Sequence, residues 1–212
     1  MDVIQYISEN TGQILLLFGQ HFYLFIVSTV FAIAIGIGLA IYVTAPGNEK
    51  TGGRVVSITG AAQAVPPIAI IALAFIFVGI GATPSIIALI IYSIVPILFN
   101  ASSGLLSVPP QVIEAGRGLG LTHRQVLWKI KIPMSLPVIM AGIRSAATIN
   151  IGTATVASFI GGGGLGDLIF MGLKLYRSDI ILTGAILTAI MAIAVDYLLQ
   201  LAESAMVPGG LK

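Results

Sequence analysis

The chain has 212 residues, of which 57% are hydrophobic and 8% are charged, and its mean hydropathy is +1.06. Soluble domains carry about 25% charged residues, so this composition excludes an ordinary soluble domain and favours a chain that lies mainly within a bilayer. The formal net charge is +2, and the ten Lys and Arg residues form no stripe that could follow a phosphate backbone, so nucleic acid is not an expected partner. Without cysteine, the sequence has no disulfide, thiolate ligand or thiolate nucleophile.

The first 19 residues are predicted to lie at or outside the membrane surface. Met1 and Asp2 do not make the basic start of a secretory signal, so we expect the N-terminus to be that of the mature chain. Residues 4–19 mix polar side chains such as Glu9 with an apolar cluster at residues 15–18. This mixture suits a short helix along the membrane surface, or else a half-buried extension of the first span.

Five apolar stretches follow, and each is long enough to cross about 30 Å of hydrocarbon, which takes about 20 helical residues. They cover residues 22–43, 55–80, 85–106, 136–160 and 180–202. The sequence therefore predicts an all-α, polytopic membrane protein with about five transmembrane helices. A single membrane domain would cover residues 20–203, and residues 204–212 would form a cytoplasmic tail.

The second predicted span is interrupted by Pro66 and Pro67. Two successive ring nitrogens remove helix hydrogen bonds, so the helix should bend or break there. Lipid cannot satisfy the freed carbonyl groups, so this part of the span is expected to face protein or a water-filled path. Both prolines are candidates for the translocation path or its gate.

The longest polar interval, residues 108–133, separates the third and fourth predicted spans and carries a spaced motif. Its fixed positions are Glu114, Ala115, Gly120, Ile130 and Pro133. The motif resembles the EAA signature of permease subunits of bacterial ATP-binding-cassette (ABC) importers: Glu-Ala-Ala, three free positions, Gly, nine free positions, then Ile, any residue, Leu and Pro. The sequence departs from it at Gly116, in place of the second Ala, and at Ile132, in place of Leu.

The motif is also consistent with a protruding helix on physical grounds. Residues 112–119 can form a short helix after Pro109 and Pro110, and Gly120 can adopt the left-handed conformation that ends a helix. The alternative is a basic loop that only fixes the topology of the chain. The complete spacing of the motif favours the protruding helix.

In the family that the motif resembles, this helix docks into a cleft of a cytoplasmic ATPase, and closure of two ATPases moves the spans. The resemblance implies that Glu114 contacts the ATPase, while Ala115 and Gly116 keep the helix thin enough to enter the cleft. The implied coupling residues are Glu114, Ala115, Gly116, Gly120, Ile130 and Pro133. Lys129 and Lys131 are expected to lie near anionic headgroups of the membrane lipid.

Further stretches are similar to the permeases of osmoprotectant importers. They are residues 140–144, residues 157–167, the pair Pro66 and Pro67, and positions within residues 92–98. The resemblance implies a type I ABC importer transmembrane domain that carries glycine betaine, choline or carnitine. It also implies ABC ATPase subunits, a second permease subunit and an external substrate-binding protein as partners, with no cofactor. Methionine-type permeases share the five-span plan, so methionine or another small solute is the alternative substrate.

A glycine-rich stretch and an acidic residue lie between the last two predicted spans. The residues are Gly161, Gly162, Gly163, Gly164 and Asp167. The glycines form either a flexible turn or a close backbone approach at an outer gate. We include all five residues among the candidates for the path or gate.

Two polar residues within spans complete the candidates for the path or gate. Asn100 can line the path, or it can serve helix packing. Arg144 can act in gating, snorkel to the interface or form an ion pair, with Asp196 as a candidate partner. His21 and His123 are the only histidines and lie far apart in the sequence, so no metal site or proton relay is predicted.

The sequence contains no catalytic motif. A phosphate-binding loop, a nucleophile elbow and paired carboxylates within the spans are all missing, so ATP must be hydrolysed by another chain. The alternative class is an ion-coupled secondary transporter, which commonly has internal repeats and several buried ionisable groups. No repeat is evident here, and the spans offer little beyond Arg144 and Asp196.

Basic residues predict the orientation of the chain. Seven of the ten lie after the first span, in the polar interval or in the tail: Lys50, Arg54, Arg117, Arg124, Lys129, Lys131 and Lys212. The positive-inside rule places these segments in the cytoplasm. We therefore expect a multi-pass protein of the bacterial cytoplasmic (inner) membrane, with its N-terminus outside and its C-terminus inside.

Overall fold

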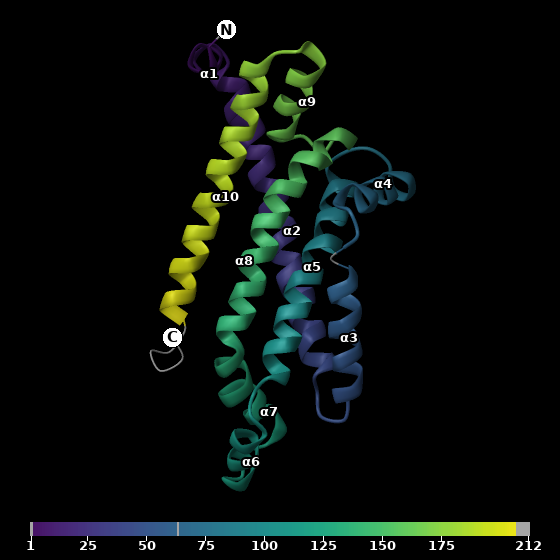
Figure 1. Cartoon of the computed structure of the whole chain (residues 1–212), viewed down its shortest axis with the longest axis vertical. Coiled ribbons are helices and arrows are strands. Elements are labelled where there is room, and N and C mark those ends of the chain that lie inside the picture. Colours follow the sequence, from purple (N-terminus) through teal and green to yellow (C-terminus); the bar gives the residue numbers. More distant parts are fainter. Residues whose placement is uncertain (1, 63, 207–212) are drawn as a thin grey trace. The chain divides into compact units, whose positions relative to one another are not determined.

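The computed structural model describes residues 2–62 and 64–206, and every regular element in this part of the chain is helical. The long helices are α2 (Thr11–Val43), α5 (Ala82–Leu106), α8 (Ile132–Ala157) and α10 (Ser178–Met206). The short helices are α1 (Val3–Glu9), α3 (Glu49–Ala62), α4 (Pro67–Val78), α6 (Pro110–Gly118), α7 (His123–Val126) and α9 (Gly166–Leu175). Figure 1 shows this order, which confirms the all-α prediction.

Two irregular turns connect the helices at the ends of α8. A π-helical turn, Leu127–Lys131, joins α7 to α8, and a 3-10 turn, Ser158–Ile160, follows α8. Together these elements make one helical run from His123 to Ile160.

Among the described residues, four helical stretches are long and apolar enough to cross a membrane: α2, α5, the run through α8, and α10. The pair α3 and α4 makes a fifth if it counts as one broken span. The break lies at the two prolines, since α3 ends at Ala62 and α4 begins at Pro67 with Pro66 as its N-cap. Proline fits this place because the first turn of a helix has no partner for its N–H groups. Four or five spans agree with the polytopic prediction.

The first span is longer than its apolar stretch suggested. The helix α2 has 33 residues and includes residues 11–19, so most of the N-terminal segment extends the first span. Only α1 precedes it as a separate short helix. At 1.5 Å per residue, α2 measures about 50 Å, which exceeds the hydrocarbon thickness of about 30 Å.

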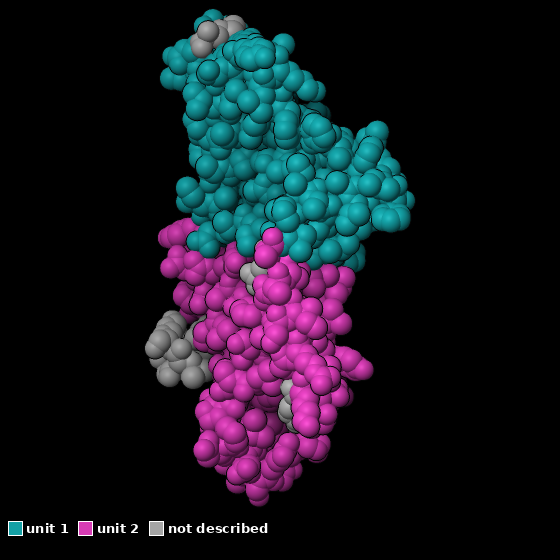
Figure 2. Space-filling model, turned by 45° about the vertical axis from the view of Figure 1, so that its right-hand side comes forward, with its two compact units in different colours: residues 1–32, 65–93, 147–196 teal, residues 33–64, 94–146, 197–212 magenta. Residues whose placement is uncertain are grey.

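The chain divides into two compact units, and the long helices contribute residues to both (Figure 2). Unit 1 consists of residues 1–32, 65–93 and 147–196, and unit 2 consists of residues 33–64, 94–146 and 197–212. Unit 1 therefore contains α1, α4 and α9. Unit 2 contains α3, α6 and α7.

The core of unit 1 is built from small and aliphatic side chains. One cluster consists of Ile71, Ala74, Ala88, Ala157 and Ile160, and another consists of Leu24, Leu89 and Ala154. The alanines allow the backbones of α4, α5 and α8 to approach closely, which is the usual basis of helix packing in membranes.

Glycines serve the same purpose in unit 2. A Cβ atom at Gly36 of α2 would lie 2.8 Å from Cγ2 of Ile97 on α5. A Cβ atom at Gly142 of α8 would lie 2.6 Å from Cβ of Asn100, also on α5. Both glycines are therefore needed for the close packing of these helices on α5.

Candidate functional site

The predicted coupling residues form a compact hairpin of α6, α7 and the π-helical turn, in which α6 packs against the other two elements (Figure 1). The helix α6 begins with Pro109 as its N-cap and Pro110 in its first turn, as expected from the fixed φ of proline. Glu114 and Ala115 are exposed, whereas Gly116 is buried. The acidic end of the motif therefore lies on the exposed surface of the helix.

The inner side of the hairpin joins the two ends of the motif. A Cβ atom at Gly116 would lie 2.5 Å from Cδ1 of Ile130 and 3.5 Å from Cδ1 of Leu121. Val126 is buried on the same side. The nine residues between Gly120 and Ile130 are therefore the length of chain that brings Ile130 back against α6.

The end of α6 is set by a left-handed glycine, as predicted. Gly120 has φ of 82°. Its N–H donates to the carbonyl of Arg117 at 2.9 Å, and the N–H of Leu121 donates to the carbonyl of Gly116 at 3.1 Å. This pair of bonds is a Schellman motif, which satisfies carbonyl groups at the end of a helix.

A capping box then begins α7, and the sequence analysis missed it. The N–H of Gln125 donates to Oγ1 of Thr122, and the N–H of Thr122 donates to Oε1 of Gln125 at 2.8 Å. The Thr-x-x-Gln spacing was the available signal. After the π-helical turn, Pro133 is the second residue of α8 and lies within the continuous run from His123 to Ile160, so its missing N–H removes one helix hydrogen bond at the change from π-helical to α-helical geometry.

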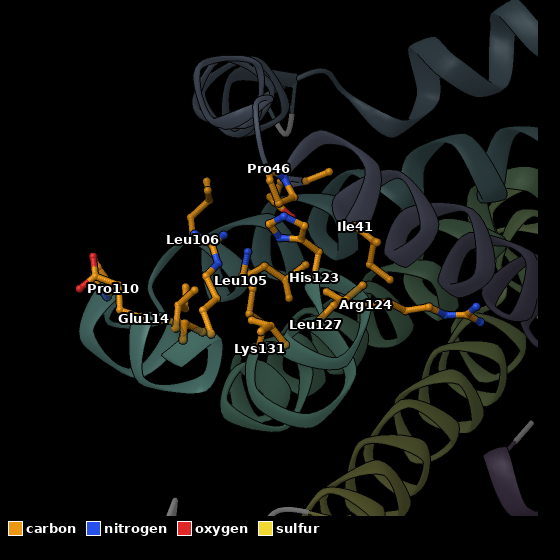
Figure 3. A pocket seen from close by; sticks show the side chains of 16 residues that line it. Ile41, Pro46, Leu105, Leu106, Pro110, Glu114, His123, Arg124, Leu127 and Lys131 are labelled. Atoms are coloured by element: carbon orange, nitrogen blue, oxygen red, sulfur yellow. The ribbon is translucent and has the colours of Figure 1, made fainter. Parts of the chain in front are cut away.

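A pocket of about 450 Å³ opens beside this hairpin in unit 2 (Figure 3). Apolar residues at the ends of α2 and α5, such as Ile41 and Leu105, line its interior. The charged and titratable residues around it are Glu114, Arg117, His123, Arg124 and Lys131. Cationic side chains therefore outnumber the single carboxylate at the pocket, and its surface is amphipathic.

The glycine segment, defined here as residues 161–165, lies in unit 1 between the 3-10 turn and α9. Gly161, Gly163 and Gly164 have φ of 79°, 77° and 96°. A Cβ atom at Gly162 would lie 2.4 Å from Oγ of Ser85 on α5. These contacts favour a close backbone approach over a flexible turn.

Asp167 follows the glycine segment in the first turn of α9. A carboxylate there interacts favourably with the helix dipole. Partial burial nevertheless raises the pKa of Asp167, and the positive charge of Lys174 lowers it by a smaller amount. A pocket of about 480 Å³ lies near the other end of the glycine segment, lined by apolar residues that include Phe75 and Phe159.

The remaining candidates for the path or gate lie apart from the glycine segment in the chain and make packing contacts. Asn100 donates from Nδ2 to the carbonyl of Pro96 at 2.8 Å and packs against Gly142. Arg144 donates to Oε2 of Glu203 on α10 at 3.1 Å, and both side chains are about a quarter exposed. Glu203 is a partner of Arg144 that the sequence analysis did not consider.

A buried polar cluster in unit 1 was also missed. Nδ2 of Asn150 on α8 lies 2.8 Å from Oγ of Ser93 on α5 and 2.9 Å from Oγ of Ser28 on α2. All three side chains are fully buried. Such interhelical hydrogen bonds hold membrane helices together, and scattered polar residues in apolar helices do not reveal which of them meet.

Comparisons with known proteins place the chain in a family. Residues 32–208 match the family described as binding-protein-dependent transport system inner membrane component. The chain is 38% identical over 210 residues to the glycine betaine/carnitine/choline transport system permease protein OpuCB of Bacillus subtilis, covering 99% of this chain and 96% of OpuCB. It is 40% identical over 186 residues to the osmoprotectant import permease protein OsmY of Salmonella typhimurium, covering 87% and 79% of the two chains.

Solved structures show the same fold. The inward-facing MetNI methionine ABC transporter matches with a TM-score of 0.79 and 24% identity, covering 92% of this chain and 96% of that chain. Together with the family match, this confirms the resemblance inferred from the motif. A partner subunit of such a transporter hydrolyses the ATP. The chain therefore belongs to the binding-protein-dependent inner membrane components, as the multi-pass permease component of a bacterial ABC importer.

Proposed function

We propose that this permease imports an osmoprotectant of the quaternary ammonium class, namely glycine betaine, choline or carnitine. The observation that carries the proposal is similarity over nearly the whole chain to permeases with these named substrates, at 37% to 40% identity. A methionine permease is the second candidate, supported by the fold alone at 24% identity.

We also propose that α6 couples the permease to the ATPase. Glu114 and Ala115 form the exposed side that enters the ATPase cleft, and this is supported by their exposure on a short helix that starts at a proline and ends in a Schellman motif. Gly116, Gly120 and Ile130 hold the hairpin behind that side, and Pro133 follows it at the start of α8. The amphipathic pocket beside it supports contact of Lys131 with anionic lipid.

The proposed assembly contains two permease subunits, two ABC ATPase subunits and an external binding protein. The hairpin of α6 and α7 lies in the cytoplasm, because the basic residues are concentrated in and around it. The N-terminus and α9 then lie outside. The glycine segment belongs to the outer gate, together with Pro66, Pro67 and Asp167, while Asn100 and Arg144 lie on the cytoplasmic half of the path.

The substrate is tested by uptake. Proteoliposomes with the complex, isolated with its native ATPase and binding protein, are given ATP inside and labelled solute outside. We expect saturable uptake of at least one of glycine betaine, choline and carnitine, and no uptake of methionine. Uptake of methionine alone would replace the osmoprotectant proposal with the second candidate.

A further inference from the structure

Two neighbouring polar side chains of α2 bind the glycine segment. The N–H of Gly164 donates to Oε1 of Gln20 at 3.1 Å. The N–H of Leu165 donates to Nδ1 of His21 at 3.2 Å. Two consecutive peptide groups of the segment are thus held by two consecutive residues of the helix.

The ring of His21 also reaches a third element of unit 1. Its Nδ1 accepts from the backbone of Leu165, so the ring proton lies on Nε2, which donates to the carbonyl of Ile151 on α8 at 3.1 Å. The side chain is fully buried. Both ring nitrogens are therefore used, and the imidazole bridges α8 and the glycine segment in its neutral form.

The glycines make this contact possible. A Cβ atom at Gly163 would lie 2.6 Å from Oε1 of Gln20, and one at Gly164 would lie 3.0 Å from Nδ1 of His21. A larger residue at either position would push the backbone away from α2. An N–H group separated from its acceptor in a buried site loses a hydrogen bond that neither lipid nor the core replaces.

We propose that Gln20 and His21 are positioning residues that fasten the outer gate to the N-terminal part of α2. The glycine segment then moves together with α2 during the transport cycle, and it does not move as an independent loop. This proposal rests on the proposed function, because it takes the segment as part of the outer gate. We call the two side chains and their bonds to Gly164 and Leu165 the α2 latch.

Two substitutions of His21 separate its two bonds. In His21→Asn, the amide oxygen can take the place of Nδ1 and accept from Leu165, whereas the bond to Ile151 is lost. In His21→Gln, the longer side chain can reach the carbonyl of Ile151, whereas the N–H of Leu165 loses its acceptor. Both variants replace the imidazole with a side-chain amide, and the two amide side chains differ in length by one methylene group. They therefore serve as matched controls for each other.

The readout is the amount of substrate transported per ATP hydrolysed, measured with the complex in proteoliposomes. We expect His21→Asn to keep this ratio within about twofold of the wild type. His21→Gln should continue to hydrolyse ATP but lower the ratio about tenfold, a factor that corresponds to about 1.4 kcal/mol. Equal ratios in the two variants would overturn the latch, since a merely structural histidine affects the amount of folded complex and not the coupling.

A disulfide tests whether the segment and α2 separate. Cβ of Gln20 lies 3.9 Å from a Cβ atom built at Gly163, which suits a disulfide, and the chain has no other cysteine. We expect the oxidised Gln20→Cys/Gly163→Cys pair to transport at least as fast as the same preparation after reduction. Slower transport on oxidation, restored by reductant, would overturn the proposal. Comparing the two redox states of one preparation cancels the strain of the substitution itself.

The failure of the proposed substrate is distinguishable from the failure of the latch. If the wild-type complex takes up none of the three osmoprotectants, the proposed substrate is wrong. The latch is then tested with a different quantity, the degree to which the binding protein stimulates ATP hydrolysis. This stimulation is measured in the oxidised Gln20→Cys/Gly163→Cys pair and divided by the stimulation in the same preparation after reduction. A ratio of one or above supports the latch, and a ratio below one contradicts it.

Discussion

On α6, Glu114 and Gly116 lie on different sides of the helix and have different tasks. The carboxylate of Glu114 is exposed and lies at the edge of the unit 2 pocket (Figure 3). Gly116 is buried against Ile130. A substitution at the first position should therefore affect a partner, whereas one at the second affects the hairpin itself.

Glu114→Arg should release the ATPase without unfolding the permease. The substitution reverses a charge on an exposed side chain, so we expect recovery of the ATPase with the tagged permease to fall about tenfold or more, the effect of losing a central contact of an interface. Co-purification from the native membrane measures it. Gln111→Arg, another exposed position on α6, is the matched control, and an equal loss in both variants would contradict a specific role of Glu114.

At the scale of elements, the hairpin of α6 and α7 depends on how its helices end. Gly120 has a positive φ, while Gly118 is the last residue of α6 and has open space around a built Cβ. The same substitution at the two positions therefore acts in opposite directions. This pair isolates the conformational requirement from side-chain contacts.

Gly120→Ala should destabilise the end of α6 by about 1 kcal/mol, because an L residue is strained in the left-handed region. Gly118→Ala should stabilise the helix by up to about 1 kcal/mol through helix propensity. Hydrogen exchange of the α6 amides measures both, with faster exchange expected in the first variant and slower exchange in the second. The same direction of change in both variants would exclude a special requirement at Gly120.

At the scale of the whole molecule, polar residues bind together helices that are far apart in the sequence. Asn150 connects α2, α5 and α8 within unit 1. Asn150→Leu should lower stability by about 1–2 kcal/mol, since it removes the interhelical bonds to Ser28, Thr29 and Ser93. The thermal midpoint in detergent measures the effect. Gln13→Leu replaces an exposed polar residue of α2 and should leave the midpoint unchanged.

The orientation of the whole chain is testable because the sequence has no cysteine. Tyr176 is 95% exposed at the end of α9, and Lys50 is exposed at the start of α3. We expect a membrane-impermeant maleimide to label Tyr176→Cys in intact spheroplasts and Lys50→Cys only after permeabilisation. The reverse pattern would place the hairpin of α6 and α7 outside and contradict the coupling proposal.

Local patterns in the sequence were sufficient for several features of the fold and the candidate site. Uninterrupted apolar stretches predicted the long helices, because a helix in lipid must satisfy its own backbone. Pro66 and Pro67 marked the interruption between α3 and α4, and Gly120 marked the end of α6. Each of these effects acts within a few residues of its cause, so neighbouring residues reveal it.

The sequence by itself thus determined the class of the protein, its long apolar helices and the spaced motif of residues 114–133. Only the tertiary structure decided what the glycine segment and the isolated polar residues contact. His21 is 144 residues from Leu165, and Asn150 is 122 residues from Ser28, so no local pattern connects them. A buried hydrogen bond requires its partners to be close in space and not in sequence, which is why packing decides where such bonds form.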